Sequence, residues 1–132
     1  MVVADPLAVY RRNQVTTVTA ERMVLLLYNG ALCHIGQGAA ALERRDIQAT
    51  SDHLGRAQEI VGTLLASLDR EAGGDIAANL AALYNYILRL MARANVEKDV
   101  RVLKEAAHLL GEIRDGWQEA LLAGNRSPVQ AG

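Results

Sequence analysis

The clearest metal-binding spacing in the sequence is Glu105-Ala106-Ala107-His108. A Glu-x-x-His pair places a carboxylate and an imidazole on one helix face, and di-iron bundles use two such pairs together with further acidic residues. This chain has one pair, and its only other histidines are His34 and His53. We therefore expect no metal site, and we interpret His108 as a solvent-exposed residue on a helix face.

The run His53-Leu54-Gly55-Arg56 allows a second chemical interpretation, because histidine phosphotransfer bundles expose a histidine followed by a basic residue. The pattern is short, and no apolar groove is indicated around it. The sequence shows no nucleophile–base pair, phosphate-binding glycine loop or basic helix. The net charge of −1 gives no general attraction for nucleic acid. We expect a protein that is not an enzyme, has no cofactor and binds no nucleic acid.

Cys33 is the only cysteine, which excludes an internal disulfide and a thiolate cluster. It lies in an apolar stretch, so we predict a small core residue. The first residues lack the basic segment and apolar run of a signal peptide. The longest unbroken apolar run, residues 23–28, is far shorter than the ~18 residues that span a bilayer. We expect a cytoplasmic protein without direct membrane insertion.

The whole chain has the length and composition of one helical domain. It has 132 residues, 51% of them apolar but only 4% aromatic, and it contains no Phe. A core of Leu, Ile, Val, Ala and Met suits packed helices. Both prolines lie near the ends, so long helices are unobstructed between them. We predict an all-α fold, an elongated antiparallel four-helix bundle with a short N-terminal helical or extended cap segment.

The predicted boundaries follow from capping residues and turns. We divide the chain into an N-terminal cap segment (1–18), the helical bundle (19–123) and a mobile tail (124–132). In the cap segment, Asp5-Pro6 starts a short helix over residues 7–12, and the β-branched run 15–19 is an extended connector. We expect Thr19, Asp75 and Asp99 to cap the first, third and fourth long helices, and residues 69–74 to form a loop.

Apolar residues at three-four spacing predict the buried stripes of the last three helices. The second helix should bury Ile47, Thr50, Leu54, Ala57, Val61, Leu64 and Leu68. The third should bury Ile76, Leu80, Leu83, Tyr84, Ile87 and Met91, and the fourth Val102, Ala106, Leu109, Ile113, Trp117 and Leu121.

The first helix has more apolar residues than one stripe needs, because residues 23–28 point in every direction around it. One interpretation is a central helix wrapped by the other three. The other is a groove for an amphipathic helix of a client protein. Both hold if Leu7, Val9 and Tyr10 cover the groove when it is empty. Tyr86 raises the same question, because it lies about 200° around its helix from Tyr84.

These residues, taken in order, resemble the flagellar secretion chaperone FliS family. Residues 17–31 read TVTAERMVLLLYNGA, similar to a family signature with a Thr-Ala-Ser-Pro-Glu start and an apolar helix ending Leu-Tyr-Asp-Gly-Ala. Tyr10 and Asn13-Gln14-Val15 fit the N-terminal motif, and Leu83-Tyr84-Asn85-Tyr86 and a late Arg114-Asp115-Gly116-Trp117 follow in register. The resemblance covers residues 10–121. The sequence departs from it at Thr19-Ala20, which replaces Ser-Pro, and at Asn29, which replaces Asp.

The resemblance implies an antiparallel bundle whose hydrophobic surface is wrapped by client helices and partly covered by the N-terminal segment. It implies a chaperone that binds the disordered C-terminal region of flagellin, prevents premature polymerisation and delivers flagellin to the export-gate membrane protein of the flagellar type III apparatus. The positions that match give a client-facing or gating set, although several members could equally be core residues: Tyr10, Val15, Leu27, Tyr28, Asn29, Leu32 and Tyr84. The sequence does not decide between a monomer and a homodimer.

Overall fold

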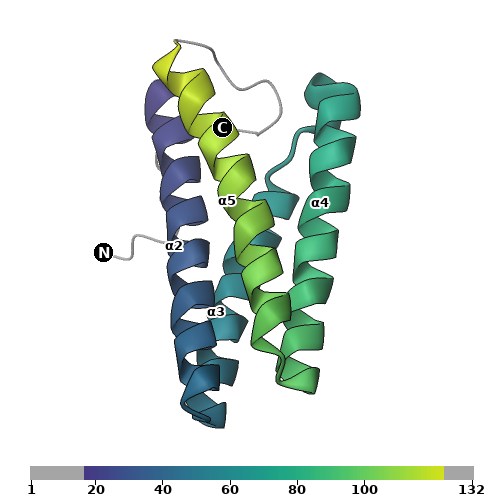
Figure 1. Cartoon of the computed structure of the whole chain (residues 1–132). Helices are drawn as coiled ribbons and strands as arrows, with labels where there is room; N and C mark the ends of the chain where they lie inside the picture. The colour runs from purple at the N-terminus through teal and green to yellow at the C-terminus, as the bar shows by residue number, and fades with distance from the viewer. Residues whose placement is uncertain (1–16, 124–132) are drawn as a thin grey trace, which may run out of the picture.

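A computed structural model of the chain describes the backbone of residues 17–123 and the side chains of residues 20–123. Four helices follow one another: α2 (Thr17–Glu43), α3 (Ile47–Ala66), α4 (Arg70–Glu97) and α5 (Val100–Leu122). They run alternately up and down, as Figure 1 shows. Helix α2 packs against α3 and α5, and α4 packs against the same two helices. The prediction of an all-α antiparallel four-helix bundle is confirmed.

Three aspartates start helices in the same way. Asp46, Asp69 and Asp99 have extended backbones, and each side chain accepts a hydrogen bond from a backbone N–H in the first turn of α3, α4 or α5. Such caps satisfy donors that a helix start leaves free. Arg45 and Lys98, with φ of 62° and 55°, reverse the chain after α2 and α4. The prediction that Asp99 caps the fourth long helix is confirmed.

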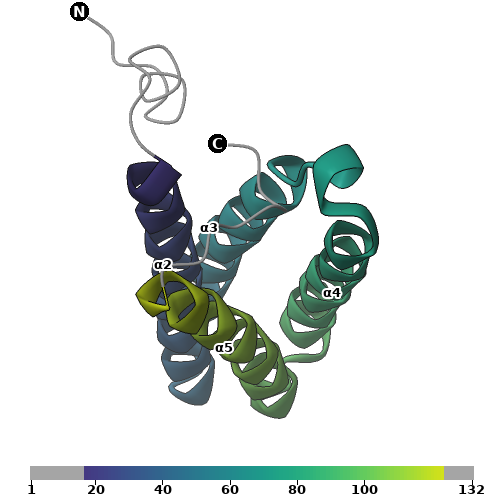
Figure 2. The same ribbon diagram turned by 90° about the horizontal axis from the view of Figure 1, so that it is seen from above.

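The start of α4 corrects the predicted loop over residues 69–74 and the predicted cap Asp75. Asp69 is the cap, and the helix begins at Arg70. The backbone is nevertheless irregular at the end of the predicted loop, because Gly74 has φ of 52° and ψ of −130° and interrupts the helix. Residues 70–73 form a turn that Figure 2 shows set at an angle to the rest of α4.

The start of α2 corrects a second boundary. The helix begins at Thr17, so the end of the predicted extended connector is helical and Thr19 is not the cap. β-Branched residues lower helix propensity only slightly, and the long apolar helix that follows outweighs this. The predicted short helix over residues 7–12 and the tail over 124–132 lie outside the described residues.

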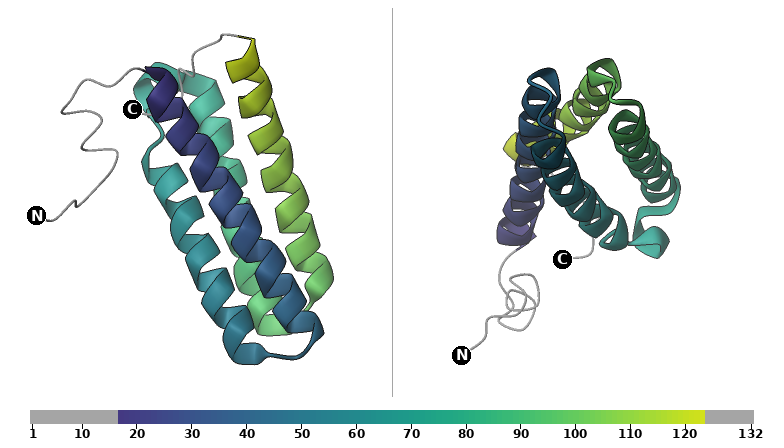
Figure 3. Two further views of the ribbon diagram at one scale, coloured as in Figure 1. Left: turned by 90° about the vertical axis from the view of Figure 1, so that its left-hand side faces the viewer. Right: turned by 90° about the horizontal axis from the view of Figure 1, so that it is seen from below.

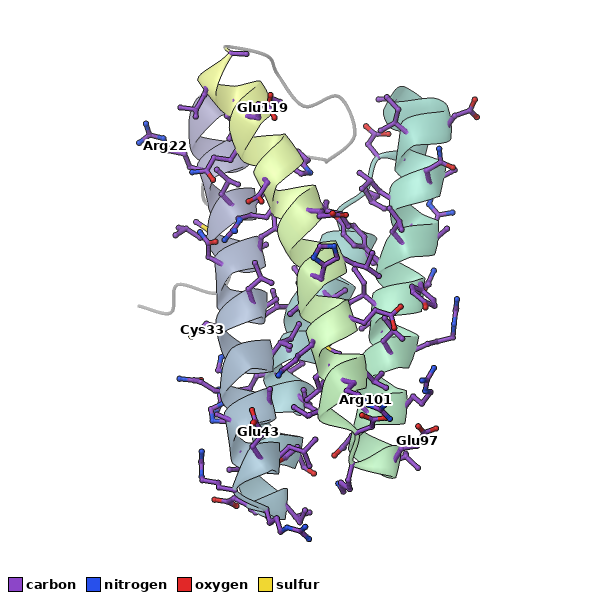
Figure 4. All side chains as sticks on the ribbon, in the orientation of Figure 1. Arg22, Cys33, Glu43, Glu97, Arg101 and Glu119 are labelled. Atoms are coloured by element: carbon purple, nitrogen blue, oxygen red, sulfur yellow. The ribbon has the colours of Figure 1, made fainter. Side chains whose placement is uncertain are left out.

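The core lies between the four helices and consists of the apolar stripes. Fully buried large side chains include Tyr28, Ile35, Leu54, Leu64, Tyr84, Ile87, Leu90, Met91, Leu103 and Leu110. In the predicted stripe of α5, Val102, Ala106 and Trp117 are buried, and Leu109 and Ile113 pack against the core as partly buried residues. Cys33 is exposed rather than buried, on the outer side of α2 (Figure 4).

Helices α4 and α5 are close where the turn at Lys98 joins them and diverge towards the other end of the bundle (Figures 1 and 2). Two hydrogen bonds of α5 are consistent with this divergence, one to α4 and one to α2. Early in α5, Glu105 accepts from the Tyr86 hydroxyl of α4 at 2.8 Å, whereas later Arg114 donates to Asn29 of α2 at 2.9 Å. Figure 3 shows α2 between α3 and α5. The second half of α5 is therefore attached to α2.

Candidate partner-binding surface

An aromatic cluster joins α2, α4 and α5 inside the bundle. Tyr28 and Tyr84 are fully buried, and their hydroxyl groups are hydrogen-bonded to each other. The ring of Tyr28 lies 6.4 Å from that of Tyr84 and 6.3 Å from that of Trp117. Tilted rings at such separations are favourable beyond the burial of their area. The sequence places these residues far apart, and the helix stripes bring them together.

Burial controls the ionisation of both tyrosines. Desolvation raises the pKa of Tyr84 to about 12, and the hydrogen bond to Tyr28 opposes part of that effect. Desolvation, with the charge and hydrogen bond of Tyr84 adding to it, raises the pKa of Tyr28 well above its ordinary value. A phenolate has no compensating positive charge in this cluster, so both groups stay neutral. The pair can hold α2 against α4, and it offers no acid–base chemistry near neutral pH.

The apolar run of α2 divides between core and surface. Val24 and Tyr28 are buried, and Leu25 and Leu27 are partly buried against the core. Leu26 faces outward, with 63% of its surface exposed. The described residues therefore do not surround this helix on all sides. The apolar side chains in excess of one buried stripe are the exposed Leu26 and its partly buried neighbours Leu25 and Leu27.

Asn29 and Leu32 also lie on α2, and Asn29 contacts α5. Asn29 is exposed, and its Oδ1 accepts the hydrogen bond from Arg114. Leu32 is partly buried against the core. Arg114 also contacts Asp115 on its own helix, with 2.9 Å between Nε and Oδ1. The amide at position 29 thus has a partner within this chain.

An uncovered apolar surface lies on α4, where α5 diverges. Ile76 is 59% exposed and Leu83 is 38% exposed, and Leu80 between them is partly buried. We call these three residues the α4 patch. They are spaced at four and three residues and so share one helix face. Further along this face, Ile87 and Leu90 are buried, because α5 is close there.

The α4 patch corrects the predicted core stripe of this helix, because Ile76 and Leu83 are not buried. The buried residues of the first half are Ala77, Ala81 and Tyr84. Two adjacent stripes at helical spacing make the apolar face wider than one packing interface requires. The width of this apolar face is the feature of the sequence that indicates a surface here. Ile47, predicted to be buried in α3, is also exposed.

The structure brings together only part of the predicted client-facing set. Tyr28 and Tyr84 touch each other in the core, which is the alternative that the sequence left open. Leu27, Asn29 and Leu32 lie on α2, the leucines partly buried and the asparagine exposed. Tyr10 and Val15 lie outside the described residues.

His108, the histidine of the Glu-x-x-His spacing, lies on the surface of α5. The His108 Nε2 lies 3.1 Å from Glu112 of the next helical turn, and both side chains are exposed. Within residues 17–123, no group of three or more His, Cys, Asp or Glu residues is arranged to hold a metal ion. None of the described helices is both long enough and apolar enough to cross a membrane.

Comparison with known proteins gives a consistent set of relatives. Residues 3–124 match the model of the family described as flagellar protein FliS. The flagellar secretion chaperone FliS of Bacillus subtilis is 32% identical over 121 residues, which cover 92% of this chain and 90% of that protein. The flagellar secretion chaperone FliSB of Pseudomonas aeruginosa is 36% identical over 79% of this chain and 82% of its own length. FliS of Salmonella typhimurium is 32% identical, with 81% and 80% covered. The chain, a four-helix bundle that matches this family over nearly its whole length, belongs to the FliS family.

Proposed function

We propose that this protein is a flagellar export chaperone that binds the disordered C-terminal region of flagellin and keeps it from polymerising prematurely. Its relatives carry the name flagellar secretion chaperone, and theirs is a family of chaperones rather than enzymes. The observation that carries the proposal for this chain is the α4 patch, an uncovered apolar face beside diverging helices. It has the chemistry to bind an amphipathic segment of a client.

The energetics favour a reversible complex. Covering a Leu-sized side chain contributes about 1.5–3 kcal/mol when the whole side chain is buried. Ile76 and Leu83 are only partly exposed, so each can contribute a fraction of that amount. A disordered client loses roughly 2–5 kcal/mol in becoming ordered. Several apolar contacts must therefore act together, and Leu26 on α2 offers a further one.

The predicted site residues take different roles in this proposal. We propose that the client also contacts α2, at Leu27, Asn29 and Leu32, and we call these residues and the α4 patch together the client surface. Tyr28 and Tyr84 act from the core by fixing α2 against α4, since neither has exposed surface. We assign Tyr10 and Val15 to the segment that covers the client surface in the free chaperone. The chaperone then acts in the cytoplasm and delivers flagellin to the export-gate membrane protein.

The test uses the full-length protein and a peptide of the disordered C-terminal region of the host's flagellin. We expect the double substitution Ile76→Gln and Leu83→Gln to weaken peptide binding in calorimetry by about tenfold or more, because it removes the apolar area of the patch. Glutamine keeps helix propensity close to that of leucine, so circular dichroism should remain unchanged.

Val96→Gln is the matched control. Val96 lies on the same helix and is 82% exposed, but it is located at the opposite end of α4. We expect its peptide affinity to equal that of the wild type. Equal affinity of the wild type and the double variant would remove the α4 patch from the site. Absence of any binding by the wild type would reject flagellin as the client.

A further inference from the structure

Two histidines meet between α2 and α3, away from the aromatic cluster and the α4 patch. The Nδ1 atoms of His34 and His53 are 3.1 Å apart, and the ring centroids are 5.4 Å apart. Both side chains are half-buried. Nothing in the proposed chaperone function uses this pair. The third histidine, His108, is exposed on α5.

We propose that His34 and His53 form a two-imidazole site for a divalent transition-metal ion such as Zn²⁺. Imidazole nitrogens are ligands that zinc, copper and nickel ions prefer. Zn–N bonds of about 2.0–2.1 Å and two nitrogens 3.1 Å apart give an N–Zn–N angle of about 98°, close to the tetrahedral value of about 109°. To direct both lone pairs at one ion, each ring must turn so that its Nδ1 lone pair points about 40° away from the line between the two nitrogens.

The two nitrogens share one proton in the absence of metal. In the hydrogen bond, one Nδ1 carries the proton and the other offers its lone pair. A metal ion needs both lone pairs, so the donor ring must move its proton from Nδ1 to Nε2 and become the other neutral tautomer. No proton leaves the protein in this step, and both rings remain neutral ligands.

The close approach of α2 and α3 holds the two rings in position. Gly38 lies one helical turn after His34, and a Cβ atom at Gly38 would stand 3.1 Å from Leu54 Cδ2 and 3.6 Å from His53 Cβ. The missing side chain lets the helices approach beside the pair. The two packed helices thus fix the backbones that carry the rings, and only the side-chain torsions must change when an ion binds.

The remaining positions around the ion fall to water, since the described part of the chain places no third His, Cys, Asp or Glu in a metal-binding group. We therefore expect an exchangeable ion, unlike the closed four-ligand sites of structural zinc. Mg²⁺ prefers oxygen ligands and should not bind here. An unfolded chain separates the two rings, so metal binding should stabilise the folded state.

The experiment titrates untagged full-length protein with Zn²⁺ at neutral pH, with Mg²⁺ as a control ion. We expect one Zn²⁺ per chain in calorimetry and a rise in Tm of about 3 °C or more at saturation. His34→Asn and His53→Asn should each abolish the rise, and His108→Asn should retain it. Nuclear magnetic resonance should show Zn²⁺ shifting the imidazole signals of His34 and His53 and leaving that of His108 in place.

Several outcomes would overturn the site. The first is the absence of saturable Zn²⁺ binding by the wild type. The second is a rise in Tm in the His34→Asn and His53→Asn proteins equal to that of the wild type. The third is loss of the rise in the His108→Asn protein while the other two variants keep it. If a substitution at position 34 or 53 unfolds the protein, the imidazole signals of the wild type decide. Unshifted signals of the pair under saturating Zn²⁺ would reject the proposal.

Discussion

The Tyr28–Tyr84 pair shows how a hydroxyl group can be placed in the core of a helical bundle. Each hydroxyl group satisfies the other, so neither polar group is buried without a partner. Among the described residues, no buried side-chain nitrogen or oxygen lacks a hydrogen-bond partner. The pair therefore ties α2 to α4, two helices that do not pack directly side by side. Its stability depends on both tyrosines keeping their protons.

We predict that the free energy of unfolding falls steeply with pH above 10. An unfolded tyrosine ionises near pH 10, whereas burial raises the pKa of Tyr84 to about 12 and that of Tyr28 further. Because the folded pKa values are raised, this contribution is fully present below pH 10 and is lost as pH rises. Because each tyrosine ionises in the unfolded chain and not in the folded one, each should lower the free energy of unfolding by about 1 kcal/mol between pH 10 and 11. Urea unfolding at pH 9–11.5 measures the decline.

The comparison protein carries Tyr28→Phe and Tyr84→Phe together, which keeps both rings and removes both ionisable groups. Between pH 10 and 11, its free energy of unfolding should decline by about 2 kcal/mol less than that of the wild type. Equal pH dependence of the two proteins would show that the tyrosines ionise freely in the folded state and that the cluster is open to water.

Particular residues show which helix boundaries could be predicted. Asp99 follows a short polar turn and precedes an apolar stripe, so its capping role could be predicted. Asp69 and Asp75 both precede helix-compatible residues, and local preference does not choose between them. Burial of Leu68, next to Asp69, fixes the chain there. That contact depends on tertiary packing and leaves no local signature in the sequence.

The site was less predictable than the fold for a related reason. Residue type showed that α2 and α4 carry surplus apolar side chains, but the tilt of α5 decides which of them are covered. Leu83 and Ile87 are four residues apart on one face, yet only Ile87 is buried. The tilt results from the packing of the whole α5 stripe against α2 and α4, so no single motif encodes it.

At the scale of elements, we predict that Gly74→Ala destabilises the protein by about 1–3 kcal/mol. Gly74 has φ of 52° and ψ of −130°, a combination that strains any residue with a Cβ atom. The strain would act where the first turn of α4 bends away from the helix. Urea unfolding followed by circular dichroism gives the difference in free energy.

Gly36→Ala provides the control with the opposite sign. Gly36 is exposed within α2, and no heavy atom lies within 4 Å of a Cβ placed there. Alanine should stabilise this helix by about 0.4–1 kcal/mol. A neutral Gly74→Ala protein would show that residues 70–73 can rearrange without cost and that the bend is not fixed by glycine.

At the scale of the whole molecule, the bundle packs tightly at one end of the α4–α5 pair and leaves an apolar face at the other. Exposed apolar side chains lower solubility and add nothing to the stability of the free protein, so their presence favours a function in binding. In the proposed function, the first sixteen residues of the chain and the flagellin segment compete for this face. A segment attached close to the surface acts at a high effective concentration, in the millimolar range for short flexible connections.

We predict that removing residues 1–16, so that the chain starts at Thr17 after the initiator methionine, tightens binding of the flagellin peptide severalfold. The gain arises because the affinity of the full-length protein is reduced by the fraction of molecules whose surface is covered. Calorimetry of both proteins with the same peptide measures it. The Ile76→Gln and Leu83→Gln substitutions in the shortened chain should reverse the gain, which separates competition at the α4 patch from a general effect of truncation. Weaker binding by the shortened protein would mean that the N-terminal residues contact the client rather than exclude it.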